Sequence, residues 1–277
     1  ILSPLLAGGC IIIGNQFNVK QAMTFWDFPM SVDVNTMWLS PTMVALLTRL
    51  NRSKEISEWT KANLKNVFVG TAPFSGPVRE GFEKMFSVRC FESYGMTETL
   101  IISSQSDFKN HDDDVSVGLP LPMVEIQVRS QENQVLGKNK EGEIWLRTPF
   151  IFTSQLGEKK SFSKTEWFYT GDQGFLSNNG SIVITGRIKD IIIRGGTNIS
   201  PRAVEDKLRS FKDILDIVVY GEPHPFWGEE VVVALVTKPN FNLNEFKSYC
   251  LTVLASDAVP SKYKIVNEFP RTNTGKV

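Results

Sequence analysis

The arrangement of short apolar runs and amphipathic stretches is the feature that most constrains the fold of this chain. Up to about residue 104, β-like runs alternate with stretches whose apolar residues recur at helical spacing. Each predicted helix begins at a proline, a residue that is favoured in the first turn. This alternation predicts a mainly parallel sheet covered by helices. The expected strands are residues 10–13, 37–39, 67–69 and 88–91, and the expected helices are residues 41–50 and 77–86.

The pattern changes near Gly118 to short β runs separated by turn signals, such as the Asn-Asn-Gly sequence that ends at Gly180. Closely spaced strands of this kind predict an antiparallel β subdomain. The expected strands are residues 124–129, 143–147, 167–169 and 181–185.

A third region, from about Arg187 to the end of the chain, has the pattern of a small α+β domain. The charged stretch at residues 186–190 separates two apolar runs and is the predicted domain boundary. The expected elements are strands at 191–193, 214–220 and 231–237, helices at 201–210 and 243–254, and a turn at Gly195-Gly196.

The charge balance and the few histidines and cysteines exclude several function classes. Lys+Arg and Asp+Glu are equal at 30 each, so no global field attracts nucleic acid or an anionic membrane. His111 and His224 lie far apart, which argues against a zinc site and most Ser-His-Asp arrangements. Cys10, Cys90 and Cys250 form no CxxC pair and have apolar neighbours, which predicts reduced, buried thiols in a cytoplasmic protein.

The apolar opening of the chain, residues 1–13, is interrupted by Pro4 and by Gly8-Gly9. Neither a signal peptide nor a membrane span is therefore expected. The chain begins with isoleucine, and we expect it to be part of a longer protein.

Residues 92–99 carry the first group of side chains suited to chemistry. They follow a predicted strand, and the carboxyl end of a strand is the usual ligand edge of an open α/β sheet. Tyr94 offers a ring face, Thr97 a hydroxyl and Glu98 a carboxylate, which suit a purine, a phosphate oxygen and Mg²⁺. The alternative is a polar turn that simply ends the strand.

Two further positions suggest contacts with a nucleotide. Asp172, next to Gly171 on an expected tight turn, could accept hydrogen bonds from both hydroxyls of a ribose, and Arg187 offers a positive fork for ribose or phosphate oxygens. The alternatives are a turn without a ligand and a surface ion pair.

The end of the chain places Lys276 on a Thr- and Gly-rich loop, where a mobile lysine could meet a phosphate. A solvated surface lysine is the alternative. The loop is not a phosphate-binding P-loop, because Pro270 and Val277 stand where that motif requires glycine and Ser/Thr. No GxGxxG motif occurs in the chain either, so a Rossmann dehydrogenase has no support.

Five motifs occur in the order and rough spacing of one enzyme superfamily. They are residues 94–98, 170–172, 186–190, 195–201 and 270–276, and together they resemble the adenylate-forming enzymes, in particular the acyl-CoA synthetases. The resemblance implies that residues 1–188 are the C-terminal portion of a large nucleotide- and acyl-binding domain. Its α/β part would be residues 1–117 and its β subdomain residues 118–188. Residues 189–277 would form a small mobile domain.

The resemblance also implies roles for single residues near the nucleotide. Tyr94 would stack on adenine, Thr97 would touch the α-phosphate and Glu98 would hold Mg²⁺. Gly95 and Met96 belong to the same nucleotide-binding segment. Asp172 would bind the ribose diol and Arg187 the nucleotide, and the loop Gly70, Thr71, Ala72, Pro73 resembles the other wall of the adenine slot.

The remaining implied roles concern catalysis and domain movement. Lys276 would be the catalytic lysine, acting as a point charge on carboxylate and phosphate oxygens. Lys189 would be the hinge, and Gly195 and Gly196 would line the coenzyme A channel because they carry no β-carbon. Trp38 could belong to the acyl pocket, but a core position is the expectation.

The implied reaction uses ATP, Mg²⁺ and coenzyme A. A carboxylic acid is activated as an acyl-adenylate and then transferred to the thiol of coenzyme A. The rivals are an acyl-AMP ligase or carrier-protein-loading enzyme, a luciferase-like oxygenase, and a non-catalytic nucleotide-binding fragment. The family's Ser/Thr/Gly-rich phosphate loop has no counterpart in residues 1–277, so we expect this stretch alone to be inactive.

Overall fold

The computed structural model describes residues 2–14, 17, 21–50, 53–72, 74, 76–106, 116–154 and 162–271. Its chain divides into two compact units, each of which is described by itself. The first comprises Ile1–Phe74 with Val78–Cys90, and the second comprises Ser75–Pro77 with Phe91–Val277.

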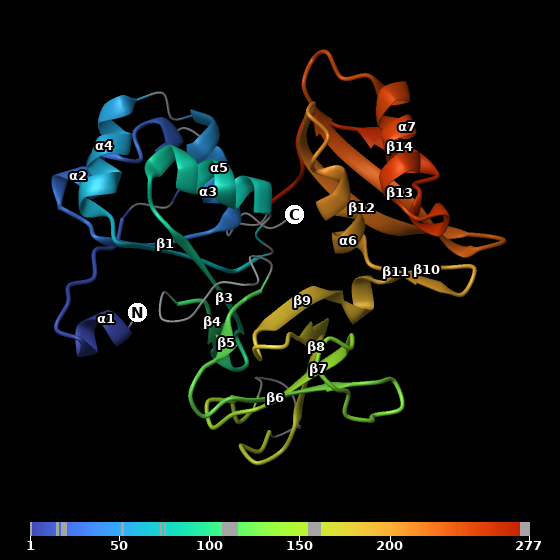
Figure 1. Cartoon of the computed structure of the whole chain (residues 1–277), viewed down its shortest axis with the longest axis horizontal. Helices are drawn as coiled ribbons and strands as arrows, with labels where there is room; N and C mark the ends of the chain where they lie inside the picture. The colour runs from blue at the N-terminus through green and yellow to red at the C-terminus, as the bar shows by residue number, and fades with distance from the viewer. Residues whose placement is uncertain are drawn as a thin grey trace. The chain divides into compact units, whose positions relative to one another are not determined.

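The first unit is built around a parallel strand pair. Thr36 lies opposite Asn66, and Leu39 opposite Val69. Helices gather around β1 in this unit, as Figure 1 shows. The elements, in chain order, are α1 (Leu2–Leu6), the 3₁₀ helix η1 (Gln21–Met23), α2 (Asp27–Ser31), β1 (Thr36–Leu39), α3 (Pro41–Leu50), α4 (Lys54–Asn63), β2 (Asn66–Val69) and α5 (Gly76–Phe86).

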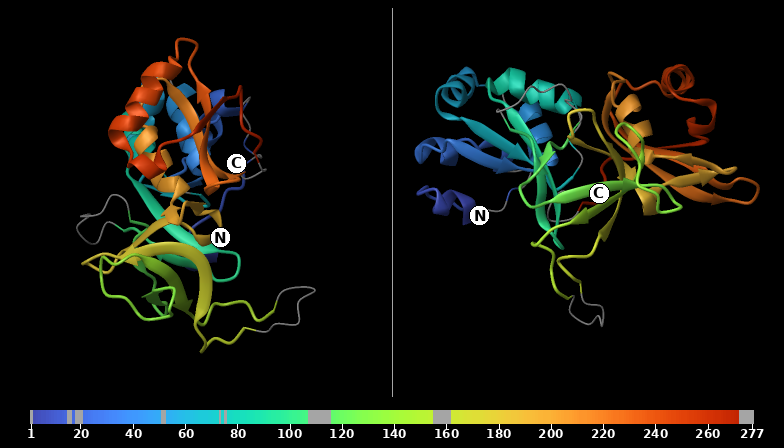
Figure 2. Two further views of the ribbon diagram at one scale, coloured as in Figure 1. Left: turned by 90° about the vertical axis from the view of Figure 1, so that its right-hand side faces the viewer. Right: turned by 60° about the horizontal axis from the view of Figure 1, so that its bottom comes forward.

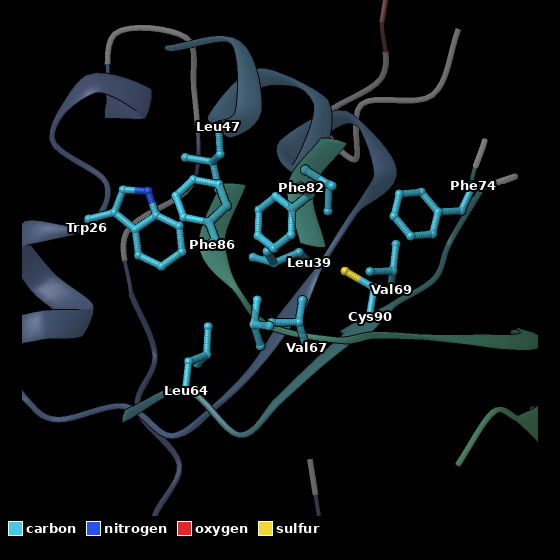
Figure 3. Close-up of a cluster of buried hydrophobic side chains, with 12 residues drawn as sticks. Trp26, Leu39, Leu47, Leu64, Val67, Val69, Phe74, Phe82, Phe86 and Cys90 are labelled. Carbon is cyan, nitrogen blue, oxygen red and sulfur yellow. The ribbon is translucent and has the colours of Figure 1, made fainter. Parts of the chain in front are cut away.

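An aromatic core joins the helices and strands of this unit (Figure 3). The ring of Phe86 packs 4.8 Å from that of Trp26 and 4.5 Å from that of Phe82, measured between centroids. The buried hydroxyl of Thr60 in α4 donates to the Phe86 carbonyl oxygen at 2.7 Å. That bond closes the end of α5, because a carbonyl in the last turn of a helix has no partner within the helix.

Three expectations for this unit are wrong. Residues 10–13 form no strand, and Cys10 is exposed rather than buried. Trp38 is 51% exposed and stacks on Phe68 instead of entering the core. The reason for Trp38 is the alternation of side chains along a strand: Leu39 points into the core, so its neighbour points to the opposite face.

The second unit begins with an antiparallel ladder. It comprises β3 (Cys90–Met96), β4 (Leu100–Ser104) and β5 (Leu119–Pro120). An antiparallel sheet follows in the order β6-β7-β8-β9, as the turn signals predict. Its strands are β6 (Glu125–Arg129), β7 (Gly142–Arg147), β8 (Phe168–Leu176) and β9 (Ile182–Arg187).

Another sheet of the second unit has the order β11-β10-β13-β12, and β14 pairs with β13 in the parallel direction. Helices α6 and α7 pack on it, as Figure 2 shows, through a core that includes Leu208 and Phe246. Ser200 and Asn242 cap the two helices with their side chains. The elements are η2 (Ile188–Asp190), β10 (Ile192–Arg194), β11 (Thr197–Ile199), α6 (Pro201–Leu208), β12 (Ile214–His224), β13 (Gly228–Thr237), α7 (Leu243–Val253), η3 (Ser256–Ala258) and β14 (Lys262–Ile265).

Candidate functional site

A buried carboxylate organises the polar site of the second unit. The Asp172 residue is 3% exposed, and its two oxygens accept from two different side chains. The Tyr94 hydroxyl donates to Oδ2, and the Arg187 Nε donates to Oδ1 at 3.1 Å. Tyr94 lies 78 residues before Asp172 in the chain, so only the tertiary structure brings the two together.

Strand register explains why Arg187 meets Asp172. The two residues are direct partners across β8 and β9, where opposed side chains lie on the same face of the sheet. Thr170 adds a brace from the same strand, since its hydroxyl donates to the Ile144 carbonyl oxygen at 2.8 Å and accepts from the Asp172 N–H at 3.1 Å. Thr170 belongs to the motif at 170–172, but the sequence indicated no role for it.

The environment keeps Tyr94 protonated. Burial, followed by the charge of Asp172 and the hydrogen bond to it, raises the pKa of the Tyr94 phenol well above its ordinary value. The phenol therefore remains a hydrogen-bond donor throughout the neutral range. Arg187 is 54% exposed along its side chain, so the cluster has one buried side and one side open to solvent.

This cluster has hydrogen-bonding capacity left for a ligand. An ionised carboxylate has about four acceptor sites, and the contacts recorded among the described residues use one on each oxygen of Asp172. The recorded contact of Arg187 uses Nε, which leaves the terminal amino groups of the guanidinium as donors. The acceptor sites left on Asp172 and the donors left on Arg187 suit a ligand with two neighbouring hydroxyl groups, because each hydroxyl can both donate and accept a hydrogen bond.

The structure corrects the prediction that Asp172 lies on a tight turn. Residues 169–172 lie within β8 instead of on a tight turn. The reason is that β8 pairs with β7 at Tyr169 and again from Gln173, and with β9 from Asp172 onward, so the strand spans the motif although its register with β7 shifts there. Gly171 still provides a local feature of a turn, since its φ of +76° is in the region that favours glycine.

The segment 92–99 is corrected in the same way. Tyr94, Gly95 and Met96 lie on β3 itself, and the turn is confined to the three residues before β4. A side chain at Gly95 is excluded, since a β-carbon there would lie 2.2 Å from the Leu100 carbonyl oxygen. The β3–β4 pairing, which the sequence did not predict, is what extends the strand.

The turn after β3 presents Thr97 and Glu98. Thr97 is exposed and Glu98 is half-buried, while the Glu98 carbonyl oxygen accepts from the Phe152 N–H at 2.8 Å. Within the described ranges no cluster of three or more His, Cys, Asp or Glu side chains is suited to a metal. Glu98 is thus a single carboxylate, which fits the way Mg²⁺ is often held by one or two carboxylates together with substrate phosphates and water.

The Gly70 loop belongs to the first unit. It follows β2, and the Gly70 N–H donates to the Leu39 carbonyl oxygen at 3.4 Å. Thr71 has a φ of +80°, an unusual value for a β-branched residue. Ala72 is half-buried, and Pro73 lies outside the described residues.

Lys189 and the two glycines lie in the last part of the second unit. Lys189 is an exposed residue of η2. Gly195 and Gly196 form the β10–β11 turn, as predicted, with φ values of +57° and +87°. A β-carbon at Gly195 would lie 3.0 Å from the Trp227 ring, whereas one at Gly196 would meet nothing within 4 Å.

The expected catalytic residue Lys276 lies outside the described residues. An anchor that the sequence did not reveal is Ser200, which caps α6 and also donates to the Thr185 carbonyl oxygen at 2.7 Å. No helix in the described part of the chain is long and apolar enough to cross a membrane.

Comparisons with known proteins cover nearly all of the chain. A family model described as AMP-binding enzyme matches residues 1–154, and one described as AMP-binding enzyme C-terminal domain matches residues 203–276. A long-chain-fatty-acid–CoA ligase of Bacillus subtilis is 29% identical over 252 residues, which cover 89% of this chain and 45% of the relative.

Two solved structures are similar in fold. ATP-bound MatB from Rhodopseudomonas palustris matches with a TM-score of 0.86 at 26% identity, over 99% of this chain and 54% of that one. The o-succinylbenzoate CoA synthetase of Bacillus subtilis, in complex with its acyl-adenylate intermediate, matches with a TM-score of 0.82 at 28% identity, over 100% of this chain and 56% of that one. The chain thus spans about half the length of these proteins.

Proposed function

The chain belongs to the AMP-binding enzyme family, and on that premise we propose that it contributes to an acyl-CoA synthetase. The superpositions confirm the predicted adenylate-forming fold. In the proposed reaction a carboxylate oxygen attacks the α-phosphorus of ATP, forming an oxygen–phosphorus bond as the bond to pyrophosphate breaks. The sulfur of coenzyme A then bonds to the acyl carbon, and AMP leaves.

The cluster of Asp172, Tyr94 and Arg187 is the observation that carries this proposal. Asp172 would accept hydrogen bonds from the ribose hydroxyls, and Arg187 would donate to the same sugar or to a phosphate oxygen. The Tyr94 ring would stack on adenine, with its hydroxyl held by Asp172. These three side chains would fix the nucleotide, and accurate placement is a large part of catalysis.

The turn after β3 would act on the reacting phosphate. The exposed Thr97 hydroxyl would donate to an α-phosphate oxygen, and Glu98 would hold Mg²⁺. Bound Mg²⁺ neutralises the negative charge of the phosphates. Gly95 and Met96 precede this turn on β3 and would form part of the floor beneath the nucleotide.

The remaining assignments are proposed from their places in the motifs. Lys276 would stabilise the negative charge that develops at the α-phosphate in the adenylation step. Lys189 would be the hinge for the change between the two half-reactions, and Gly195 and Gly196 would border the passage of the pantetheine arm. Gly70, Thr71, Ala72 and Pro73 would provide the other wall of the adenine slot.

The last two proposals concern the class of the substrate and the location of the protein. The similar proteins act on acids as different as a long-chain fatty acid and o-succinylbenzoate, so the substrate is proposed only as a small carboxylic acid. A cytoplasmic location is proposed because all three cysteines are free thiols, as a reducing compartment would keep them.

Nucleotide binding by the 277-residue chain tests the central cluster. AMP, 2′-deoxy-AMP and 3′-deoxy-AMP are titrated by calorimetry into the wild type, Asp172→Asn and Glu125→Gln. The last variant is the matched control, because Glu125 pairs with Arg147 on the exposed surface of the same sheet. Near-ultraviolet circular dichroism verifies that each variant is folded.

We expect Asp172→Asn to weaken AMP binding about ten- to a hundredfold, as a lost hydrogen bond to a charged group costs about 1.5–3 kcal/mol. The deoxynucleotides should bind the wild type more weakly than AMP does, and this difference should disappear in Asp172→Asn. Equal binding of all three nucleotides to folded wild type and Asp172→Asn would refute the ribose assignment.

Turnover decides between the coenzyme A acceptor and its rivals. The chain is assayed within a protein that also supplies the Ser/Thr/Gly-rich phosphate loop, with a panel of carboxylic acids, ATP and coenzyme A. We expect consumption of coenzyme A that depends on ATP and acid. Accumulation of acyl-AMP without a thioester would support an acyl-AMP ligase or carrier-protein loader instead.

A further inference from the structure

The last described residue of the chain, Arg271, is held by an ion pair. Its Nη2 contacts Oδ2 of Asp216 on β12. Lys276 lies five positions after Arg271 in the sequence. The ion pair therefore fixes the chain shortly before the lysine to which the proposed reaction assigns the adenylation step.

The backbone of β12 is shaped to present Asp216. Ile214 pairs with Thr237 and Asp216 with Val236, so the register shifts between Ile214 and Asp216. Such a bulge re-aims the side chains of the strand that contains it. Asp216, the residue directly after this shift, is the one that contacts Arg271.

Contacts other than the one with Arg271 also hold the carboxylate of Asp216 in place. Its Oδ1 accepts from the Ile217 N–H at 2.9 Å and lies 3.5 Å from Nη1 of Arg209. Arg209 in turn lies 3.7 Å from Glu205, which accepts from the Val219 N–H at 2.8 Å. The network links α6 to β12 and leaves Oδ2 of Asp216 as the atom that takes Arg271.

The ion pair with Asp216 lies closer to Lys276 along the sequence than the preceding recorded backbone contact does. The preceding backbone contact recorded among the described residues is that of the Val266 N–H with the Leu235 carbonyl oxygen at 2.9 Å. Lys276 lies ten positions after Val266 but only five positions after Arg271. The effective concentration of a tethered group falls with about the −3/2 power of tether length, so losing the ion pair should lower it about threefold.

We propose that Asp216 and Arg271 are positioning residues that anchor the segment leading to Lys276, so that Lys276 reaches the nucleotide in the adenylation half-reaction. This proposal rests on the proposed function. Neither residue touches a reacting atom, and each acts through the lysine five positions beyond Arg271. The thioester half-reaction, to which Lys276 is not assigned, does not depend on the ion pair.

The test compares Asp216→Asn, Arg271→Gln and the double variant with the wild type. Asp213→Asn is the matched control. Asp213 directly precedes β12, forms an ion pair with Lys238 and makes no recorded contact with Arg271. Hydrogen exchange of residues 266–277, followed by mass spectrometry, reports the anchoring in the 277-residue chain. The two half-reactions are measured in the protein that also supplies the phosphate loop.

We expect each single variant to speed exchange in residues 266–277 and to slow acid-dependent ATP–pyrophosphate exchange about threefold. Thioester formation from preformed acyl-adenylate should keep its wild-type rate. The double variant should be no slower than either single variant, since both remove the same ion pair. Asp213→Asn should match the wild type in every assay.

Two results would overturn the proposal. One is unchanged exchange and unchanged adenylation in folded Asp216→Asn. The other is equal slowing of both half-reactions, which would indicate general damage to the domain. Failure of the proposed function itself is recognised separately, because the wild type would then show no pyrophosphate exchange with any acid of the panel.

Discussion

Replacing Tyr94 with phenylalanine removes one hydroxyl and keeps the ring. The substitution therefore separates the two roles of this residue, the hydrogen bond to Asp172 and the stacking proposed against adenine. Asp172 would keep its contact with Arg187 but lose the donor on Oδ2. Because Asp172 is 3% exposed, water has little access to the acceptor left behind.

The expected cost is a loss of about 2 kcal/mol in the free energy of unfolding at neutral pH. A hydrogen bond to a charged group contributes about 1.5–3 kcal/mol, and an acceptor left buried without a partner costs a similar amount. The half-exposed guanidinium of Arg187 still compensates part of the charge, which keeps the value below the upper limit. The raised pKa of Tyr94 adds a pH effect: the protonated phenol stabilises the fold below the ordinary tyrosine value, and this stability is lost as pH rises above it.

Urea unfolding followed by near-ultraviolet circular dichroism measures this cost, and calorimetry with AMP measures the effect on binding. Tyr169→Phe is the matched control, because Tyr169 is 40% exposed and its ring packs on Trp145 without a recorded hydrogen bond from its hydroxyl. We expect the control to change stability by less than about 0.5 kcal/mol. Equal stability of the two variants would refute the Tyr94–Asp172 bond in solution, and complete loss of AMP binding in Tyr94→Phe would refute stacking by the ring.

Three further outcomes are expected. Burial raises the pKa of Glu205 to about 7, so the contribution of its protonated form to stability is present at low pH and is lost as pH rises to that value. Urea unfolding of the wild type should therefore show a fall in stability of at most about 3 kcal/mol between pH 4.5 and 7.5. Glu205→Gln should remove this fall, and an unchanged dependence of stability on pH in that variant would contradict the prediction. Ellman's reagent should label exposed Cys10 in the native protein but not Cys90, whose pKa burial raises to about 12, and rapid labelling of both would count against the core. Gly195→Ala should destabilise by about 1–2 kcal/mol, through positive φ and contact with Trp227, and an unaltered melting curve would argue against this turn.

Local patterns predicted several elements of this chain. Proline at the start of α3 and of α6 is a signal that acts within a single turn, and both helices begin where it indicates. The glycine pair at 195–196 predicted a turn for the same reason, since the positive φ is a property of the residues themselves. The order of the five motifs predicted the family, which the family models confirm.

Elements that depend on distant partners were not predictable in the same way. The ladder of β3 and β4 extends the strand through Tyr94, and the pairing of Asp172 with Arg187 across β8 and β9 places the expected tight turn at Asp172 within a strand. Trp38 and Cys10 have apolar neighbours in the sequence, yet both are exposed, because burial depends on what packs against a side chain.

The sequence by itself determined which chemical groups are present and in what order: a phenol, a carboxylate and a guanidinium within three separate motifs. Only the tertiary structure decided that Tyr94 and Arg187 share the two oxygens of Asp172. The physical reason is that the pairing of β8 with β9 places Arg187 beside Asp172, whereas packing of β3 on the core of the sheet β6-β7-β8-β9 brings Tyr94 to the same carboxylate and leaves it little access to water. A charge with little access to water must find its partners within the protein, and those partners are set by the fold.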